Sequence, residues 1–354
     1  MIRVLVAEDS ATARALLVSI LSAEPDIHVV GEARTGVEAV EMALGLTPDL
    51  VTMDVHMPEL DGIEATRQIM TRSPRPILIV SSAAGTDIEM SLEATRAGAL
   101  MVLAKPQGTA SSGHEAERRQ LVSMVRALAH VKVVRRHGAA ITSSPSAGPR
   151  SGPITGPRAV AGGSAVSLVA IAASTGGPAA LRIILSSLPA DFPVPILVVQ
   201  HIARGFASGL AHWLGGDSPL RVKLGELGEP AVAGTVYIAP DDRHLGARRD
   251  PAGDLRIVLD NAPPVGTFRP SASYMFRSCA QNIGRGVLGV ILTGMGDDGV
   301  AGLRDLRTAG GRILAQDEAS SVIYGMPREA YRAGVVDQVV ALDDVARRIR
   351  ELSQ

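Results

Sequence analysis

The chain has 354 residues, a length that suggests about two domains of ordinary size. Its 35 basic and 36 acidic residues give a net charge of −1, which excludes a surface built throughout for nucleic acid. The single cysteine, Cys279, excludes a disulfide framework and a cysteine-based zinc site, and no apolar run is long enough to span a membrane.

Short apolar runs alternate with amphipathic stretches over the N-terminal third of the chain. The apolar runs, which are rich in β-branched residues, are 2–7, 27–31, 50–53, 77–81 and 100–103. The amphipathic stretches between them are 12–21, 37–46, 63–70 and 88–97. This alternation predicts five βα units whose parallel sheet is covered by helices on both faces.

Residues 1–110 hold 15 acidic and 8 basic residues, a net charge of −7.

A segment rich in glycine, proline and serine follows. Between 138 and 164, 15 of 27 residues are of these types, and prolines recur at every fourth position from Pro145 to Pro157, which blocks a helix and disfavours a sheet. Because such a composition buries too little apolar surface to offset its ordering entropy, we predict a flexible linker, entered from a helix that ends near 133. Residues 118–190 hold nine basic and no acidic residues. They form either an anion-binding arm or, the interpretation we favour, a basic helix that runs into the linker.

The alternation resumes after the linker. Strand-like runs are 166–172, 196–199, 235–238, 255–259, 287–292 and 312–315, and helix-like stretches are 178–188, 271–283, 302–309 and 343–352. We predict a second α/β domain, doubly wound, whose sheet is mostly parallel with some antiparallel edge.

Acidic, hydroxyl and basic residues follow the strands of the first domain. Glu8 and Asp9 follow the first strand, Asp54 the third, Ser81 ends the fourth and Lys105 follows the fifth. Ligands of open α/β sheets bind at this edge, where the carboxyl ends of the strands meet. Three carboxylates there suit a hard cation such as Mg²⁺, beside which Asp54 can accept a phosphoryl group. A single carboxylate at a strand end is often only a helix N-cap, but that does not explain the combination.

These features resemble the receiver domain of response regulators, and the resemblance covers all five βα units, residues 1–125. It implies a flavodoxin-like (βα)5 fold in which Asp54 is the phosphoacceptor and Mg²⁺ is the cofactor for phosphorylation. Glu8 and Asp9 would be the metal-binding acids, and the backbone carbonyl of His56 would be a further metal ligand.

The same resemblance assigns the supporting residues of phosphorylation. Lys105 would pair with a phosphate oxygen and Ser81 would be the switch hydroxyl, with Ser82 as the adjacent alternative. Where receivers often carry an aromatic switch residue this chain has Val102, so the signal cannot be transmitted by an aromatic flip.

Three segments of the second domain place candidate catalytic residues at strand ends. Ser174 lies in Ala-Ser-Thr-Gly-Gly-Pro between a strand and a helix, His201 ends the next apolar strand, and Asp298 follows a later strand. A nucleophile, a base and an orienting acid are the roles of a catalytic triad, which is recognised by roles and not by chain order. The residues alone leave a second interpretation open, in which the serine turn is an anion-binding nest and His201 is structural. The glycines of the loop 293–299 do not match a dinucleotide fingerprint, and Ser174 does not lie in a G-x-S-x-G elbow.

The segments 173–178, 198–201, 237–240, 269–271, 292–299 and 316–330 resemble the catalytic domain of the chemotaxis protein-glutamate methylesterases, the CheB family. The resemblance implies that Ser174 is the nucleophile, His201 the general base and Asp298 the orienting acid. Backbone N–H groups of Thr175 and Met295 would form the oxyanion hole, and the esterase domain would need no cofactor.

The implied activity is hydrolysis of glutamyl methyl esters on chemoreceptors, with release of methanol and with deamidation of receptor glutamines, activated by phosphorylation in a two-component chemosensory system. The implied partners are methylated chemoreceptors and the histidine kinase of a chemosensory array. We expect a cytoplasmic protein that binds no nucleic acid and does not insert into the membrane. The alternative is a receiver tethered to a non-catalytic α/β docking module. Residues 202–204 and 272–273 depart from the family pattern beside the expected substrate cleft, and so bear on which receptor is served.

We predict a receiver domain at 1–125, a linker helix and Pro/Gly/Ser-rich tether at 126–164, and a methylesterase domain at 165–354. A hypothesis on regulation is that the acidic receiver lies across the esterase cleft and blocks a bulky receptor until Asp54 is phosphorylated. Because adjacent side chains in a turn cannot both aim at one imidazole, we expect Asp297 to face solvent or to cap the helix that follows Asp298. Cys279 is expected to be buried and inert.

Overall fold

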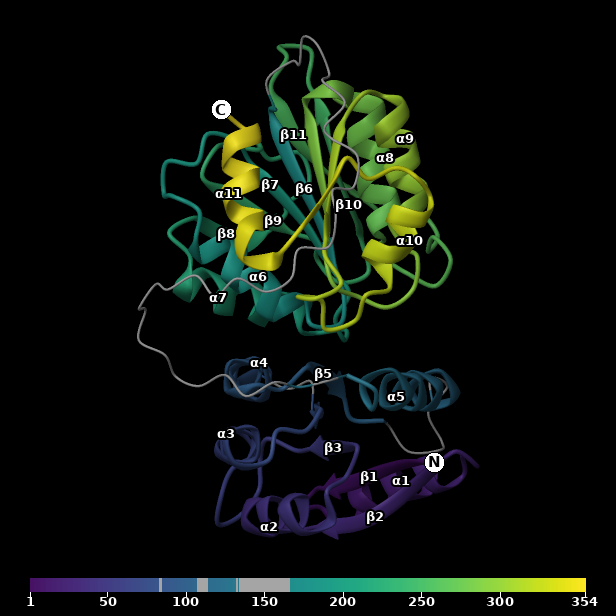
Figure 1. Ribbon diagram of the computed structural model, residues 1–354. Helices are drawn as coiled ribbons and strands as arrows, with labels where there is room; N and C mark the ends of the chain where they lie inside the picture. Colours follow the sequence, from purple (N-terminus) through teal and green to yellow (C-terminus); the bar gives the residue numbers. More distant parts are fainter. Residues whose placement is uncertain (83–84, 107–113, 132, 134–165) are drawn as a thin grey trace, which may run out of the picture.

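The computed structural model describes residues 1–82, 85–106, 114–131, 133 and 166–354, which fold into two α/β domains (Figure 1). The segment 134–165, which contains most of the predicted linker, lies outside the described residues. Within the described ranges, none of the helices combines the length and the apolar character that a membrane span requires.

The N-terminal domain is a five-stranded parallel sheet with the strand order β2-β1-β3-β4-β5, which confirms the predicted flavodoxin-like fold. Its strands are β1 (Ile2–Ala7), β2 (Ile27–Ala33), β3 (Leu50–Met53), β4 (Ile77–Ser81) and β5 (Met101–Ala104). The helices are α1 (Ala11–Ser22), α2 (Gly36–Leu46), α3 (Gly62–Arg72), α4 (Gly85–Ala97) and α5 (His114–Leu128). Every residue of β3 and β4 is buried, as expected for central strands covered on both faces.

Short polar side chains start three of these helices. Ser10, Thr35 and Asp61 each accept a hydrogen bond from the backbone N–H three residues further on, which is the N-cap pattern. Directly after the Asp61 cap, a Cβ on Gly62 would lie 1.9 Å from the carbonyl oxygen of Asp54. Glycine is therefore required for α3 to start this close to the phosphoacceptor candidate.

The last helix of this domain extends past the limit expected from the sequence. α5 buries Leu121, Val125 and Leu128 in the same apolar core as β1 and β4, so the helix belongs to this domain through residue 128 although the predicted limit is 125. The limits of the tether and of the second domain lie in or beside undescribed residues and stay predictions.

The C-terminal domain is built on a seven-stranded sheet with the order β14-β13-β12-β6-β7-β9-β8, and all neighbouring strands in it run parallel. Its strands are β6 (Leu168–Ala173), β7 (Ile196–Gln200), β8 (Arg221–Leu224), β9 (Thr235–Ile238), β12 (Val287–Ile291), β13 (Arg312–Gln316) and β14 (Gln338–Val340). The helices are α6 (Gly177–Ser186), α7 (Ala207–Asp217), α8 (Ala272–Asn282), α9 (Val300–Thr308), α10 (Met326–Arg332) and α11 (Leu342–Leu352). The predicted doubly wound α/β fold is confirmed.

We expected an antiparallel edge on this sheet, and the structure differs. The strand expected at 255–259 is β11 (Leu255–Asp260), which pairs antiparallel with β10 (His244–Arg249) in a separate two-stranded sheet. The hairpin turns Leu245 and Ile257 into the core beneath α8, so its apolar face is covered by a helix and does not join the main sheet.

The strand order of the main sheet reverses beside β6. The chain passes from β6 to β7 on one side and later returns with β12 on the other side. Ligands of open α/β sheets bind at the carboxyl ends of the strands at such a switch point. Ser174, His201 and Thr293 all follow the strands that meet there.

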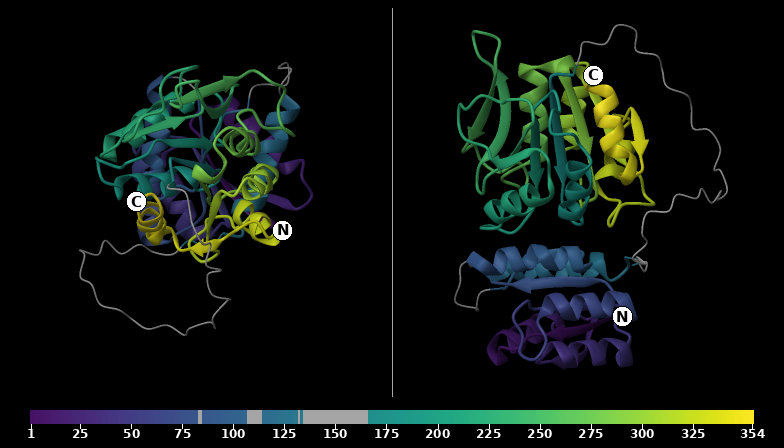
Figure 2. Two further views of the ribbon diagram at one scale, coloured as in Figure 1. Left: turned by 90° about the horizontal axis from the view of Figure 1, so that it is seen from above. Right: turned by 90° about the vertical axis from the view of Figure 1, so that its left-hand side faces the viewer.

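The two domains lie against each other, with α4, β5 and α5 facing the C-terminal domain (Figure 1 and Figure 2). α4 packs on α6 and α7, where Arg96 forms an ion pair with Asp217 at 2.5 Å and lies over the Trp213 ring, 5.4 Å from its centroid. Ile88, on the same helix, packs so closely on Gly209 that a Cβ there would be 2.3 Å away. The interface therefore combines apolar packing with a charged contact.

Candidate functional site

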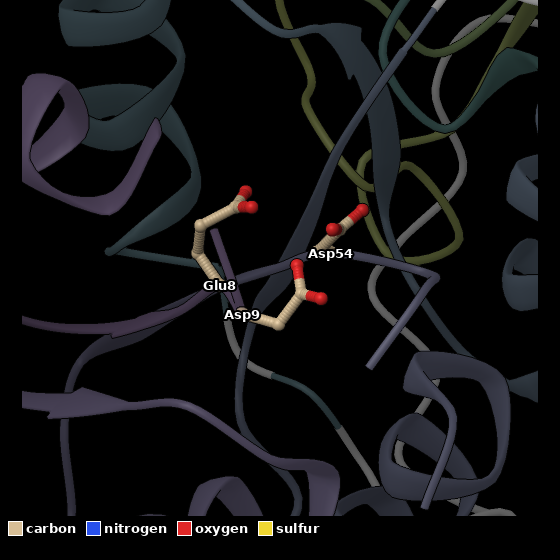
Figure 3. A group of neighbouring side chains, drawn as sticks. All are labelled: Glu8, Asp9 and Asp54. Carbon is tan, nitrogen blue, oxygen red and sulfur yellow. The ribbon is translucent and has the colours of Figure 1, made fainter. Parts of the chain in front are cut away.

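Three carboxylates meet at one edge of the N-terminal sheet. Ligand oxygens of Glu8, Asp9 and Asp54 lie within 4.8 Å of one another, and Figure 3 shows the three side chains around one space. Lys105 places its Nζ 2.9 Å from the Glu8 carboxylate and 2.8 Å from Asp54. One ammonium against three carboxylates leaves excess negative charge among hard oxygen donors, a set that fits Mg²⁺.

Burial and charge perturb this cluster. Burial raises the pKa of Glu8, and the neighbouring charge of Asp54 adds to the rise despite the opposing effect of Lys105. Burial also works to lower the pKa of Lys105, but its hydrogen bonds to Asp54 and Glu8 raise it overall. The lysine is therefore charged at neutral pH, and a cation bound beside the carboxylates would favour the ionised form of Glu8.

The other predicted residues of this edge differ in their exposure. Ser81, at the end of β4, is fully buried, and its Oγ has no hydrogen-bond partner among the described residues. Its carbonyl oxygen accepts from the backbone N–H of Lys105 at 2.8 Å, which fixes the two strand ends side by side. The side chain of His56 is exposed and is not part of the carboxylate cluster, so only the backbone of this residue stays a candidate ligand.

Ser174 occupies the turn between β6 and α6. Its backbone N–H donates to the carbonyl oxygen of Thr293 at 3.0 Å, and its own carbonyl accepts from the N–H of Gly177 at 2.8 Å. Gly176 has φ 77°, a left-handed conformation that glycine adopts readily, and α6 starts directly after it. These bonds fix the backbone that carries the candidate nucleophile.

Gln200 is a site residue that the sequence motifs did not reveal. Its Nε2 donates to the carbonyl oxygen of Ser174 at 2.8 Å and to that of His201 at 2.7 Å, which ties the serine turn to the end of β7. A Cβ added to Gly177 would lie 1.9 Å from Oε1 of Gln200, which is too close, so α6 must start with a glycine. The sequence shows only a glutamine before His201, and the fold is needed to turn its amide back to the serine.

The imidazole of His201 is paired with the carboxylate of Asp298. Nε2 lies 2.9 Å from Oδ2, and the two side chains are only 10% and 5% exposed. The other ring nitrogen, Nδ1, is buried and has no hydrogen-bond partner among the described residues. The ring thus uses the opposite nitrogen for its acid from the trypsin-type triad, in which Nδ1 faces the aspartate.

The structure brings Ser174 to the same place but does not bond it to the histidine. The backbone N–H of His201 donates to the carbonyl oxygen of Ala173 at 2.9 Å, directly before the serine. Within the described parts of the chain, no hydrogen bond joins the Ser174 hydroxyl to the imidazole. Catalytic hydrogen bonds are often loose without substrate.

Asp298 lies at the N-terminus of α8, where several donors hold its carboxylate. The backbone N–H groups of Ala272 and Ser273 donate at 2.7 and 3.0 Å, that of Gly299 at 2.9 Å, and the hydroxyl of Ser271 at 2.8 Å. Burial alone would raise the pKa of Asp298, but the hydrogen bond and charge of His201 and the Ser273 donors lower it to about 2. The acid therefore stays ionised and fixed in orientation.

Asp297, directly before it, is exposed, whereas Asp298 is buried. Both residues line a cleft of about 590 Å³ together with Phe268 and Arg304. Met295, half-buried, lines a larger cleft of about 910 Å³ between α5 and α10. Thr175, the other predicted oxyanion residue, is fully buried.

Residues of the N-terminal domain close the space in front of His201. The cavity lined by Met101 and Val102 of this domain and by Gln200 and His201 of the other has a volume of only about 10 Å³. Such a volume holds at most a single water. The N-terminal domain therefore covers this side of the imidazole in the present arrangement of the domains.

Residues 169–349 match the family model described as CheB methylesterase, and residues 4–112 match that described as response regulator receiver domain. A protein of Myxococcus xanthus (strain DK1622), named protein-glutamate methylesterase/protein-glutamine glutaminase 4, is 55% identical over 348 residues, or 98% of this chain and 96% of that protein. A protein of Anaeromyxobacter dehalogenans (strain 2CP-C), named protein-glutamate methylesterase/protein-glutamine glutaminase 3, is 49% identical over 349 residues, or 99% and 98% of the two chains.

A solved structure agrees with the second domain. The crystal structure of the Thermotoga maritima CheB methylesterase catalytic domain aligns with a TM-score of 0.52 and 37% identity, and covers 53% of this chain and 100% of that one. Together with the matches along nearly the whole sequence, this makes the chain a member of the CheB methylesterase family, with a response regulator receiver domain before the catalytic domain.

Proposed function

We propose that the protein is a phosphorylation-activated protein-glutamate methylesterase that also deamidates receptor glutamines in chemosensory adaptation. The observation that carries the proposal is the buried His201–Asp298 pair beside Ser174 at the switch point of the second sheet. The names of the relatives support both reactions. A docking module without catalysis needs no imidazole held against a buried, ionised carboxylate, so we favour the enzyme.

The chemistry follows from the protonation state that Asp298 imposes. With Nε2–H donating to this carboxylate, Nδ1 of His201 carries the lone pair that takes the proton of Ser174. The serine oxygen adds to the ester carbonyl carbon, and the tetrahedral intermediate collapses when His201 returns the proton to the departing methanol. Water then adds to the acyl-enzyme in the same way and releases the glutamate. A glutamine follows the same route with ammonia as the leaving group.

We propose that the backbone N–H groups of Thr175 and Met295 bind the developing oxyanion. Thr175 lies just before the N-terminus of α6, where the helix dipole favours negative charge. The hydroxyl of Thr293 donates to the carbonyl oxygen of Thr175 at 2.9 Å, which supports the orientation of this peptide.

We further propose that the histidine kinase of a chemosensory array supplies a phosphoryl group to Asp54 in the cytoplasm. Glu8, Asp9 and Asp54, with the backbone carbonyl of His56, would hold Mg²⁺, which when bound would offset the charge of the transferring group. Lys105 would bind a phosphoryl oxygen by its charge, and Ser81 would bind another by its hydroxyl, which has no hydrogen-bond partner among the described residues.

The test is methanol release from a methylated chemoreceptor by full-length protein, with and without a phosphodonor. We expect release that rises on phosphorylation and is absent in Ser174→Ala. If the wild type releases no more methanol than Ser174→Ala in both conditions, the enzyme proposal is wrong and the docking module stands. Parallel measurement of ammonia from a receptor with glutamine at the same sites tests the deamidation.

A further inference from the structure

Phe268 covers one face of the His201 imidazole. The two ring centroids are 4.2 Å apart and the ring planes are inclined by only 8°. The phenyl ring lies in the loop between β11 and α8, where Val265 and Phe268 exchange two backbone hydrogen bonds of 3.1 Å each. The proposed reaction assigns this ring no role.

We propose that Phe268 is a positioning residue whose phenyl face stabilises the protonated imidazole of His201. The inference rests on the proposed function, in which His201 takes the proton of Ser174. It concerns the protonated imidazole, which the ionised Asp298 stabilises at Nε2 and to whose face Phe268 would add a second stabilising contact.

One short segment holds both partners of the histidine. Phe268 stacks on the imidazole, and three positions later Ser271 donates its hydroxyl to Asp298, the acid of that imidazole. The Ser271 backbone N–H donates to Nδ1 of the buried His244 at 3.2 Å, which anchors the segment to β10. The ring position is therefore fixed by the same backbone that orients the carboxylate.

A stacked phenyl ring attracts a charged imidazole more strongly than a neutral one. Two neutral aromatic rings favour offset or edge-to-face contacts at centroid distances of roughly 4.5–7 Å over a face-to-face arrangement. A cation is instead attracted to the negative face of a phenyl ring. A nearly parallel contact at 4.2 Å therefore gains strength when the ring is protonated. In the proposed reaction the imidazole gains its charge when it takes the proton of Ser174, so the contact would favour the transition state over the ground state.

Charged groups near the imidazole could also change the stability of its protonated form. Asp298 faces Nε2, and on the adjoining loop Arg204 is 83% exposed and paired with Asp242 at 2.6 Å. On the loop of Phe268 itself, the guanidinium of Arg269 turns to the carbonyl oxygens of 261 and 262. The other residues that line the small cavity at the imidazole are uncharged: Thr95, Leu100, Met101, Val102, Pro178, Gln200 and Ile202.

The experiment compares Phe268→Leu, which keeps apolar bulk, with Phe268→Tyr, which keeps the aromatic face, in phosphorylated full-length protein. For Phe268→Leu we expect kcat for methanol release to fall about 3- to 10-fold with KM little changed. The acid-side midpoint of kcat/KM should move about half to one unit to lower pH. Phe268→Tyr should stay within about twofold of the wild type with an unmoved midpoint.

A second measurement does not depend on activity. NMR titration of the His201 ring, assigned by its loss in His201→Gln, should show a lower midpoint in Phe268→Leu and an unchanged one in Phe268→Tyr. Phe268→Met serves the same purpose if the leucine variant does not fold. Equal midpoints in all folded variants would overturn the proposal and leave Phe268 as packing. A wild type without esterase activity but with the expected NMR shift would contradict the proposed function and not the ring contact.

Discussion

The contact between α4 and α7 makes a quantitative prediction about regulation. If the receiver restrains the esterase by covering it, removing a contact across the interface should raise the basal activity. Arg96 reaches across this interface to Asp217 and to the face of Trp213, while its other partner, Glu93, lies on its own helix. Arg96→Ala should therefore weaken the closed arrangement without touching either site.

The magnitude follows from the exposure of the groups. Arg96 and Asp217 are each about one third exposed (33% and 32%), so solvent screening limits the ion pair to about 0.5–1 kcal/mol. The cation–π contact adds about 0.5–1 kcal/mol. A total of about 1–2 kcal/mol shifts the ratio of closed to open protein about 5- to 30-fold. Where the closed form predominates, the basal rate should rise by that factor.

The assay is the initial rate of methanol release by unphosphorylated full-length protein. Arg67→Ala is the matched control, because Arg67 on α3 also pairs with a glutamate three residues earlier but has no partner across the interface among the described residues. A fragment comprising 165–354 gives the rate without the receiver. Higher salt should narrow the difference between Arg96→Ala and the wild type, since the ion pair is partly exposed. An Arg96→Ala protein no faster than Arg67→Ala, or a fragment slower than the full chain, would refute occlusion.

The two sites should separate by mutation. Ser174→Ala should abolish methanol release but keep phosphorylation at Asp54. Asp54→Asn should abolish phosphorylation but keep the basal methanol release. Near-normal release by Ser174→Ala would show that the serine is not the nucleophile. Asp298→Asn should lower kcat by on the order of 10⁴, the loss known for the corresponding change in trypsin, whereas exposed Asp297→Asn keeps most activity; the opposite order moves the acid by one residue. Because the pKa of Asp298 is lowered from 3.8 to about 2, its ionised form stabilises the fold above pH 3.8 and this stabilisation is lost as pH falls toward 2. The unfolding free energies of wild type and Asp298→Asn should therefore approach each other as the pH falls from about 4 toward 2; a difference that stays constant over this range contradicts the lowered pKa.

Strong local patterns were predictable from the sequence, and weak ones were not. Central strands such as β12 are continuous apolar runs and were found within a residue or two. The edge strand β8 reads Arg-Val-Lys-Leu and is only partly buried, so its pattern does not stand out. α7 has two consecutive glycines in its last turn and no side-chain cap, and α10 has only seven residues. These elements form because the packed domain holds them, not because their own sequence favours them.

The residues of the candidate site also fall into a group that the sequence predicts and a group that only the fold reveals. Ser174, His201 and Asp298 were identifiable because each follows a strand, and parallel strands bring their carboxyl ends together. Gln200 and Phe268 contact the site from segments that are remote in sequence from their partners: Gln200 bonds to Ser174, and Phe268 stacks on His201. A glutamine inside a strand end and a phenylalanine in a proline-rich loop look ordinary until the fold places them.

Strand β5 connects the carboxylate cluster at Asp54 to the site at His201 over a short distance. Val102 in this strand borders the small cavity at the His201 imidazole, and Lys105, directly after the strand, forms an ion pair with Asp54. Three residues of extended backbone span roughly 10 Å. If Asp54 is phosphorylated as proposed, a shift of Lys105 toward the phosphoryl group would pull on the same strand that borders the cavity at His201. The carboxylate cluster and the His201 imidazole are thus linked by less than the length of one strand. A rigid strand could couple them without the aromatic switch residue that other receivers often carry.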